Sequence, residues 1–208
     1  ICVFSFHPVK IIATGEGGMV LTNNKTIASK LKKLRSHGIT SDKMEMFEKP
    51  NDEKWNYQQV MLGFNFRMTD IQAALGISQL KRIEKFLVKR RKIAKIYDNE
   101  LSDTGLTVPY QSRESHSSYH LYPILIDEMK RNISQIDFYE KLLKKKIIVN
   151  IHYIPIYLQP FYKNLGFKQG YCPNSEKYFK SVITLPLHYS LSEKDQEYII
   201  KSIKEILT

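Results

Sequence analysis

A lysine that follows the first apolar stretch of the chain is the residue best suited to covalent chemistry. Lys10 closes the run Ser5-Phe6-His7-Pro8-Val9-Lys10, and the glycine-rich stretch Thr14-Gly15-Glu16-Gly17-Gly18 follows shortly after it. A lysine amine forms imines with aldehydes and ketones when it is held in place and can lose its proton. The glycines let a backbone come close to a flat or phosphorylated ligand, and the Ser5 hydroxyl could hold a phosphate. Because lone lysines are mostly surface charges, a solvated cation remains the alternative on spacing alone.

The cysteines and histidines do not form a recognisable metal site or catalytic triad. Cys2 and Cys172 are too few for a disulfide framework and have no Cys-x-x-Cys spacing, which favours a reducing cytoplasm. The remaining candidates have no partners at ligand or triad spacing; they are His7, His37, His116, His120 and His188. We therefore expect no metal site.

The chain is strongly basic, with 32 Lys and Arg residues against 21 Asp and Glu residues and a net charge of +11. This balance keeps a nucleic-acid-binding or regulatory domain open as an alternative function. The positive runs at 30–35, 89–92 and 144–146 fall in stretches of helical periodicity, where a solvated outer face is the simpler interpretation. Basic and aromatic residues do not cluster as in nucleic-acid-binding surfaces, and no stretch approaches the roughly 18 apolar residues that span a bilayer. We therefore expect no nucleic acid and no membrane among the partners.

The first residues are predicted to form two strands and a helix. Residues 2–6 and 18–22 are apolar and are separated by the glycine-rich turn, which predicts two short strands. Residues 25–36 carry an apolar stripe and precede Gly38, which predicts a helix that ends at this glycine.

Residues 39–62 are polar and lack firm periodicity. We expect a surface loop whose far end is anchored by the aromatic side chains of Trp55 and Tyr57.

A strong helix start follows this loop. Thr69 and Gln72 have the T-x-x-Q spacing of a capping box, and an apolar face continues from there to about residue 100. We expect one long connecting helix over 68–101 that bends at most once and does not stop.

The second half of the chain alternates strand and helix patterns, which predicts a small α/β module. We expect strands at 119–126, 147–153 and 182–185 and helices at 135–146, 174–180 and from 193, with Ser134 and Ser192 as caps. The predicted domains are residues 1–67, the connecting helix at 68–101 and residues 102–208.

Further motifs follow the Lys10 segment in a fixed order. They are Arg35-Ser36-His37-Gly38, the stretch 63–76 (GFNFRMTDIQAALG) and Leu185-Pro186-Leu187. Together with residues 5–18, they resemble the DegT/DnrJ/EryC1/StrS family of pyridoxal-phosphate (PLP) sugar aminotransferases over nearly the whole chain. The resemblance implies an α/β protein of the fold type I PLP-dependent transferases, with the end of the large PLP-binding domain and a small C-terminal α/β domain.

The resemblance also implies roles for individual residues. Lys10 matches the lysine that forms the Schiff base with PLP and then moves protons between the cofactor and the substrate carbon. Ser5 matches a hydroxyl near the cofactor phosphate or the substrate. Asn65 matches an asparagine that reaches the cofactor phosphate of the neighbouring subunit, which implies a homodimer with a shared active site. Without the family, Asn65 could simply be a turn residue.

The strand end at Asn150, Ile151, His152 and Tyr153 aligns with a segment that contacts the nucleotide-sugar. From the residues alone, His152 and Tyr153 could be ordinary half-buried side chains. Within the family, SFHPVK and residues 117–126 and 150–157 most resemble C4 aminotransferases that act on UDP-linked 4-keto-6-deoxy-N-acetylhexosamines in pseudaminic acid biosynthesis.

The expected function is therefore that of a cytoplasmic enzyme that transfers an amino group, from glutamate, to the C4 ketone of such a UDP-sugar. A PLP-dependent sugar dehydratase of the same family is the alternative, although members with that activity replace the lysine that is present here as Lys10.

The chain departs from the family in one large respect. It has no counterpart of the family's N-terminal half, which supplies a phosphate-binding turn, a ring that stacks on the cofactor and a carboxylate that pairs with the pyridinium nitrogen. An apolar strand at residues 2–6 would also need neighbours on both edges, and the chain does not begin with Met. We expect the C-terminal part of a longer protein, and we do not expect this part to transaminate alone.

Overall fold

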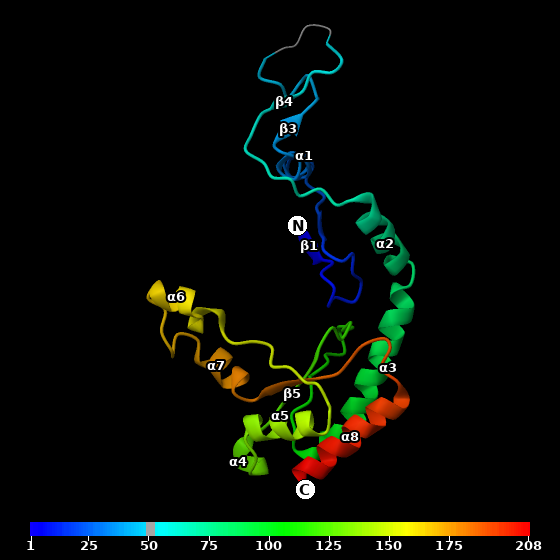
Figure 1. Cartoon of the computed structure of the whole chain (residues 1–208), viewed down its shortest axis with the longest axis vertical. Coiled ribbons are helices and arrows are strands. Elements are labelled where there is room, and N and C mark those ends of the chain that lie inside the picture. Colours follow the sequence, from blue (N-terminus) through cyan, green and yellow to red (C-terminus); the bar gives the residue numbers. More distant parts are fainter. Residues whose placement is uncertain (49–52) are drawn as a thin grey trace. The chain divides into compact units, whose positions relative to one another are not determined.

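The computed structural model describes residues 1–48 and 53–208 of the 208-residue chain (Figure 1). The chain forms two compact units, Ile1–Ile83 and Glu84–Thr208, which we call unit 1 and unit 2. In the described part of the chain, no helix has the length and apolar character needed to cross a membrane.

Unit 1 begins with a two-stranded antiparallel ribbon. β1 (Cys2–Ser5) pairs with β2 (Gly18–Leu21), so that Ser5 lies opposite Gly18. The two strands predicted here are confirmed, each ending one residue earlier than expected. Every residue of the ribbon is exposed within the chain, so the ribbon buries neither face.

The first helix, α1 (Lys25–Leu34), is closed by side-chain and backbone contacts at its ends. Oδ1 of Asn24 accepts a hydrogen bond from the N–H of Ile27 at 3.0 Å, which caps the N-terminus. Gly38 has a φ of 72°, and its N–H donates to the Lys33 carbonyl at 2.8 Å. Because this left-handed conformation costs glycine little, the chain can turn back on the helix end. The predicted helix is confirmed.

Residues 39–62 contain more regular structure than the predicted loop. β3 (Ile39–Thr40) pairs antiparallel with β4 (Gln58–Gln59). The expected anchors are wrong, because the side chains of Trp55 and Tyr57 are 79% and 64% exposed.

Other side chains hold this region. Met46 is buried. Oε1 of Gln58 accepts hydrogen bonds from the N–H groups of Phe47 and Glu48, and its Nε2 donates to the Glu48 carbonyl at 2.6 Å. The Gln58 side chain on β4 thus anchors this region, where the sequence pattern predicts that aromatic residues do so.

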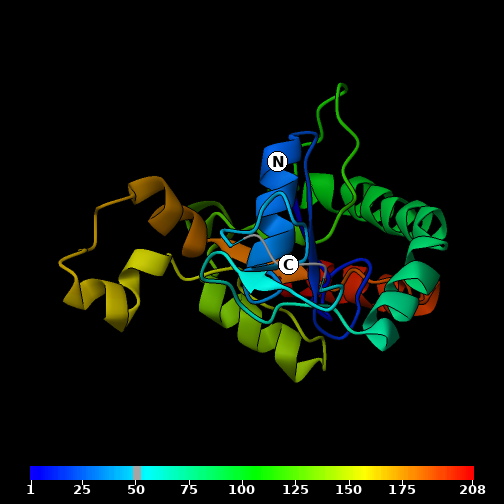
Figure 2. The same ribbon diagram turned by 90° about the horizontal axis from the view of Figure 1, so that it is seen from above.

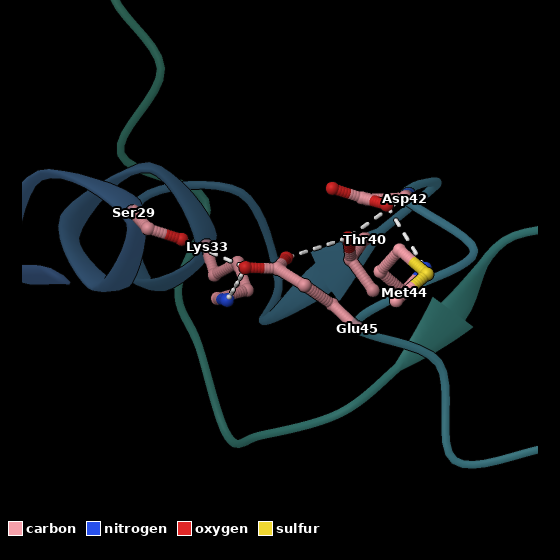
Figure 3. A network of polar contacts seen from close by, with 6 residues as sticks. All are labelled: Ser29, Lys33, Thr40, Asp42, Met44 and Glu45. Carbon is pink, nitrogen blue, oxygen red and sulfur yellow. Dashed lines mark hydrogen bonds and ion pairs between the residues drawn. The ribbon is translucent and has the colours of Figure 1, made fainter. Parts of the chain in front are cut away.

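A carboxylate ties the same region to α1 (Figure 3). Glu45 accepts hydrogen bonds on Oε1 from the Ser29 hydroxyl at 2.9 Å and the Lys33 amine at 2.7 Å. Its Oε2 accepts one from the Thr40 hydroxyl at 2.9 Å. The hydrogen bond from Lys33, followed by those from Ser29 and Thr40, lowers the pKa of Glu45 from 4.5 to about 2.

Two helices stand where a single connecting helix is expected over 68–101. α2 (Asp70–Leu80) ends before Lys81, and α3 (Ile83–Leu101) begins after Arg82. The expectation of an uninterrupted helix is therefore wrong. At the interruption, the Arg82 N–H donates three residues back instead of four, so the backbone tightens into a turn.

Two strands and three helices form the core of unit 2 (Figures 1 and 2). β5 (Tyr122–Leu125) pairs antiparallel with β6 (Val182–Leu185), whose four residues are all buried. α3, α5 (Gln135–Lys144) and α8 (Glu193–Leu207) contribute apolar side chains to the same hydrophobic cluster. Ser134 and Ser192 cap α5 and α8 as predicted.

The remaining elements of unit 2 are short. Figures 1 and 2 show η2, α6 and α7 as an arm at one side of this core. α7 confirms the helix predicted at 174–180, whereas α4 is not anticipated by the sequence pattern. The short elements are η1 (Ser102–Thr104), α4 (Glu128–Arg131), η2 (Ile156–Leu158), α6 (Pro160–Asn164) and α7 (Pro173–Phe179).

The strand expected over 147–153 does not form. Only Asn150 pairs there, through an isolated antiparallel bridge to Thr184 of β6. Oδ1 of Asn150 accepts the N–H of Ile151 at 2.7 Å, which removes that donor from a possible ladder. In the described residues, the predicted alternation of strands and helices therefore reduces to one strand pair, with isolated bridges from Asn150 to Thr184 and from Thr107 to Leu125.

One of the basic runs contains a buried cation instead of a fully solvated face. Arg90 on α3 is 7% exposed, and its Nη1 donates to the carbonyls of Tyr119 at 3.0 Å, His120 at 3.3 Å and Leu187 at 3.1 Å. These carbonyls lie just before β5 and just after β6. Arg90 therefore ties α3 to both strands of the pair.

Replacing Arg90 by Met is expected to lower the free energy of unfolding of the 208-residue chain by about 3 kcal/mol, because three carbonyls lose their donor. Urea unfolding followed by circular dichroism measures this change. Lys95→Met, at an exposed position of the same helix, is the matched control and should change the stability by less than about 0.5 kcal/mol. Equal losses in the two variants would contradict the role of Arg90.

The pKa of Glu45 is expected to rise from about 2 toward 4.5 in Lys33→Met, because the largest cause of the lowered value is lost. A carboxyl ¹³C NMR titration measures it. Since the folded-state pKa lies below the unfolded one, Glu45 stabilises the fold above about pH 4.5 and loses this contribution as the pH falls toward about 2. Lys30→Met, at an exposed position of α1, should leave the pKa unchanged. A value near 4.5 in the unmodified protein would rule the network out.

Candidate functional site

Lys10 lies in a tight turn directly after β1. Its N–H donates to the His7 carbonyl at 2.9 Å, and the Ser5 hydroxyl accepts a hydrogen bond from the His7 N–H at 3.4 Å. The structure therefore brings the Ser5 hydroxyl and the Lys10 backbone N–H to the same residue, His7. Lys10 is half-buried, and its amine has no hydrogen bond or ion pair with any residue in the described ranges. An amine without such a partner can form an imine with a carbonyl group once it has lost its proton.

The glycine-rich stretch forms a compact turn behind Lys10. The buried Thr14 donates from its hydroxyl to the Glu16 carbonyl at 2.6 Å, and its N–H donates to the Phe6 carbonyl at 2.9 Å. A Cβ on Gly17 would lie 2.5 Å from the Thr14 hydroxyl and 2.9 Å from the Met68 methyl group. Gly17 also has a φ of 153°, so only glycine fits without displacing its neighbours.

The N-terminus of α2 holds this turn. Thr69 and Gln72 form the predicted capping box, in which the Thr69 hydroxyl accepts from the Gln72 N–H and the Gln72 carboxamide accepts from the Thr69 N–H. Nε2 of Gln72 also donates to the Glu16 carbonyl at 3.0 Å. The sequence pattern shows Gln72 as a cap only. Its second contact joins the motif at 63–76 to the glycine-rich stretch at 14–18.

Asn65 lies on an extended segment beside the end of α1. It forms an antiparallel bridge with Ser36. The rings of Phe64 and Phe66 stack with their centroids 4.9 Å apart and their planes 8° from parallel. Because side chains alternate along extended backbone, the Asn65 side chain faces away from this pair. Its carboxamide is exposed and makes no hydrogen bond with the described residues, so it can bind a group from outside unit 1.

The remaining predicted site residues lie in unit 2, next to β6. Asn150 exchanges backbone hydrogen bonds with Thr184, with N···O distances of 2.8 and 3.3 Å. Nδ1 of His152 lies 2.9 Å from the Thr184 hydroxyl. Burial lowers the pKa of His152. Ile151 and His152 are half-buried, whereas Tyr153 is 70% exposed.

Tyr153 borders an open depression of about 450 Å³. Residues 154–156 and Asn174, Ser175 and Tyr178 of α7 also line it. The depression therefore lies between the candidate substrate segment and the arm.

A buried carboxylate fixes the arm next to this depression. Oε1 of Glu176 accepts hydrogen bonds from the Tyr157 hydroxyl at 2.7 Å and from the Gly170 N–H at 2.6 Å. The hydrogen bond from Tyr157 is the largest cause that lowers the pKa of Glu176. The Tyr157 hydroxyl also accepts a hydrogen bond from the Cys172 N–H at 3.2 Å. Sequence patterns do not reveal this contact, because its partners are far apart in the chain.

The residues present in unit 1 fit one part of a PLP site. They offer a half-buried amine without a partner for the aldehyde and a serine hydroxyl that can still donate to a phosphate oxygen. Among the described residues, no group of three or more His, Cys, Asp or Glu side chains is arranged to hold a metal ion.

Known proteins provide the context for this geometry. The profile of the DegT/DnrJ/EryC1/StrS aminotransferase family matches residues 1–204. The chain is 36% identical to the UDP-4-amino-4,6-dideoxy-N-acetyl-β-L-altrosamine transaminase of Campylobacter jejuni over 206 residues, which are 99% of this chain and 52% of that protein.

Solved structures of sugar aminotransferases also resemble this chain. Helicobacter pylori PseC, described as an aminotransferase of pseudoaminic acid biosynthesis, has a TM-score of 0.85 and 33% identity, and the match covers 98% of this chain and 52% of that one. The PLP form of the putative sugar aminotransferase Spr1654 of Streptococcus pneumoniae has a TM-score of 0.82 and 32% identity, with coverages of 99% and 51%.

The likeness confirms the expected fold class and agrees with PLP as the cofactor of this family. The chain spans about half the length of the curated relatives it matches. With a profile match that extends over residues 1–204, the chain belongs to the DegT/DnrJ/EryC1/StrS aminotransferase family.

Proposed function

We propose that the full-length protein is a PLP-dependent aminotransferase that uses Lys10 as its Schiff-base residue. The observation that carries this proposal is the half-buried Lys10 amine, which has no partner among the described residues. Lys10 follows β1 in a tight turn, next to the glycine-rich turn that α2 holds. Membership of a PLP-dependent aminotransferase family suggests that this amine forms the Schiff base with PLP. The lysine also argues against the dehydratase alternative.

Lys10 would hold and move the proton at the reacting carbon of the substrate. When bound, PLP supplies an aldehyde that condenses with amines and a ring that takes up electrons from that carbon. The Lys10 amine must lose its own proton to act as a base. The Ser5 hydroxyl would donate to a phosphate oxygen or to the substrate from the end of β1.

The proposed substrate is a UDP-linked 4-keto-6-deoxy-N-acetylhexosamine that receives its amino group, from glutamate, at C4. The names of the Campylobacter and Helicobacter relatives support this choice. Asn150, Ile151, His152 and Tyr153 would contact the nucleotide-sugar, beside the depression that Tyr153 borders. The net charge of +11 suits an anionic diphosphate substrate.

We further propose that the protein acts in the cytoplasm as a homodimer with shared active sites. The exposed Asn65 carboxamide would donate to the cofactor phosphate of the neighbouring subunit.

The full-length protein is expected to show an absorption band near the edge of the visible range, because an imine joins Lys10 to the cofactor. Borohydride should shift this band and leave a pyridoxyl group on the Lys10 peptide, which mass spectrometry detects. Lys10→Ala should abolish both signals. Lys25→Ala, at an exposed position of α1, is the matched control and should retain them.

The proposal fails if the band persists in Lys10→Ala. It also fails if the full-length protein has no chromophore and instead binds DNA tightly in a salt-dependent manner, which would favour the nucleic-acid-binding alternative.

Mixed dimers test the shared site. Lys10→Ala and Asn65→Ala homodimers should each lose the PLP band, whereas a co-expressed dimer of the two variants should recover it. One of its two sites then combines Lys10 from one subunit with Asn65 from the other. If Asn65 acts within its own subunit, no intact site forms and the band stays absent. Asn23→Ala, at another exposed asparagine, serves as the control for the substitution and should keep the band.

A further inference from the structure

Thr184 is the polar residue in the centre of a buried strand, and its hydroxyl reaches the candidate substrate segment. β6 reads Val-Ile-Thr-Leu, and Thr184 is 6% exposed. Its backbone N–H and carbonyl are both bonded to Asn150. The hydroxyl lies 2.9 Å from Nδ1 of His152 and has no other hydrogen-bond partner among the described residues.

Hydrogen-bond accounting fixes the direction of this contact. A neutral imidazole has one nitrogen that donates and one that accepts. If Nδ1 carried the proton, the Thr184 hydroxyl would accept it, and its own hydrogen would be buried without a partner, which is costly. If the hydroxyl donates, both groups are satisfied. Burial also lowers the pKa of His152, which favours the neutral ring with an acceptor nitrogen.

The opposite nitrogen is then left to face a ligand. Nε2 of His152 makes no hydrogen bond with the described residues, and the side chain is half-buried. The ring is further held by Tyr153, whose centroid is 4.6 Å away with the planes at 72°.

We propose that Thr184 is a positioning residue that fixes His152 as the tautomer protonated on Nε2, so that His152 donates a hydrogen bond to an oxygen of the nucleotide-sugar. The ligand part of this inference rests on the proposed function, in which residues 150–153 contact the nucleotide. The part that concerns the tautomer rests on the contact between Thr184 and His152 alone. Two separate measurements therefore test it.

The first measurement is the tautomer itself. In the ligand-free, full-length protein with ¹³C,¹⁵N-labelled histidine, the His152 shifts should report a proton on Nε2. His152→Gln identifies the signal by its loss. Thr184→Val keeps the shape and the strand preference of the side chain but removes the hydroxyl, so it should shift His152 toward the other tautomer. Thr184→Ser keeps a hydroxyl and should restore the original shifts. Shifts that are the same in Thr184→Val and in the unmodified protein overturn the proposal.

The second measurement is UDP binding by calorimetry. His152→Ala and Thr184→Val should each weaken UDP binding by roughly tenfold. The double variant should bind no more weakly than His152→Ala, because Thr184 acts only through this ring. Additive losses would show that Thr184 acts in another way and would overturn its positioning role. Unchanged binding in His152→Ala would contradict the proposed nucleotide contact, and with it the donor role of Nε2, irrespective of the tautomer result.

Discussion

The guanidinium of Arg90 donates from α3 to carbonyls at the end of the central strand pair where β5 begins and β6 ends. Buried carbonyls outside a ladder need donors, and a guanidinium can serve several acceptors at once because its N–H groups are fixed in one plane. This contact sets where β5 begins and where the chain leaves β6. β6 in turn carries Thr184, on which Asn150 and His152 are aligned. The position of the candidate substrate segment thus depends on the buried guanidinium of Arg90.

Local signals in the sequence predicted much of the fold, whereas long-range partners did not show in it. The caps at Thr69, Ser134 and Ser192 need only a few neighbouring residues, and the structure confirms them. The strand expected over 147–153 was wrong, because its apolar alternation says nothing about the Asn150 side chain that takes a ladder donor. Arg90 could not be separated from its exposed neighbours, since its acceptors lie about 30 and 97 residues away.

In the candidate site, too, some residues could be predicted from local sequence signals and others could not. Lys10 and the glycines after it attract attention from their types and spacing alone, and the turn around Gly17 shows why these residues occur together. The roles of Asn65 and residues 150–153 came from the resemblance, because an exposed amide or a half-buried histidine has no distinctive pattern. Gln72 was predicted only as a helix cap. Thr184 was not singled out, although a polar residue within the apolar strand Val-Ile-Thr-Leu is a signal that can be looked for.

The arm of unit 2 is held in a way that affects how the protein opens. Its short helices contribute no residue to the hydrophobic cluster of the core, and the Glu176 carboxylate instead joins Tyr157 to Gly170. The arm is joined to the core by a hydrogen bond from Nε2 of Gln135 on α5 to the Phe179 carbonyl on α7, at 2.9 Å. Because no arm residue belongs to the core cluster, we expect the arm to open at a lower free energy than the strand pair. The α7 residues that line the depression beside Tyr153 can then move away while the strand pair stays folded.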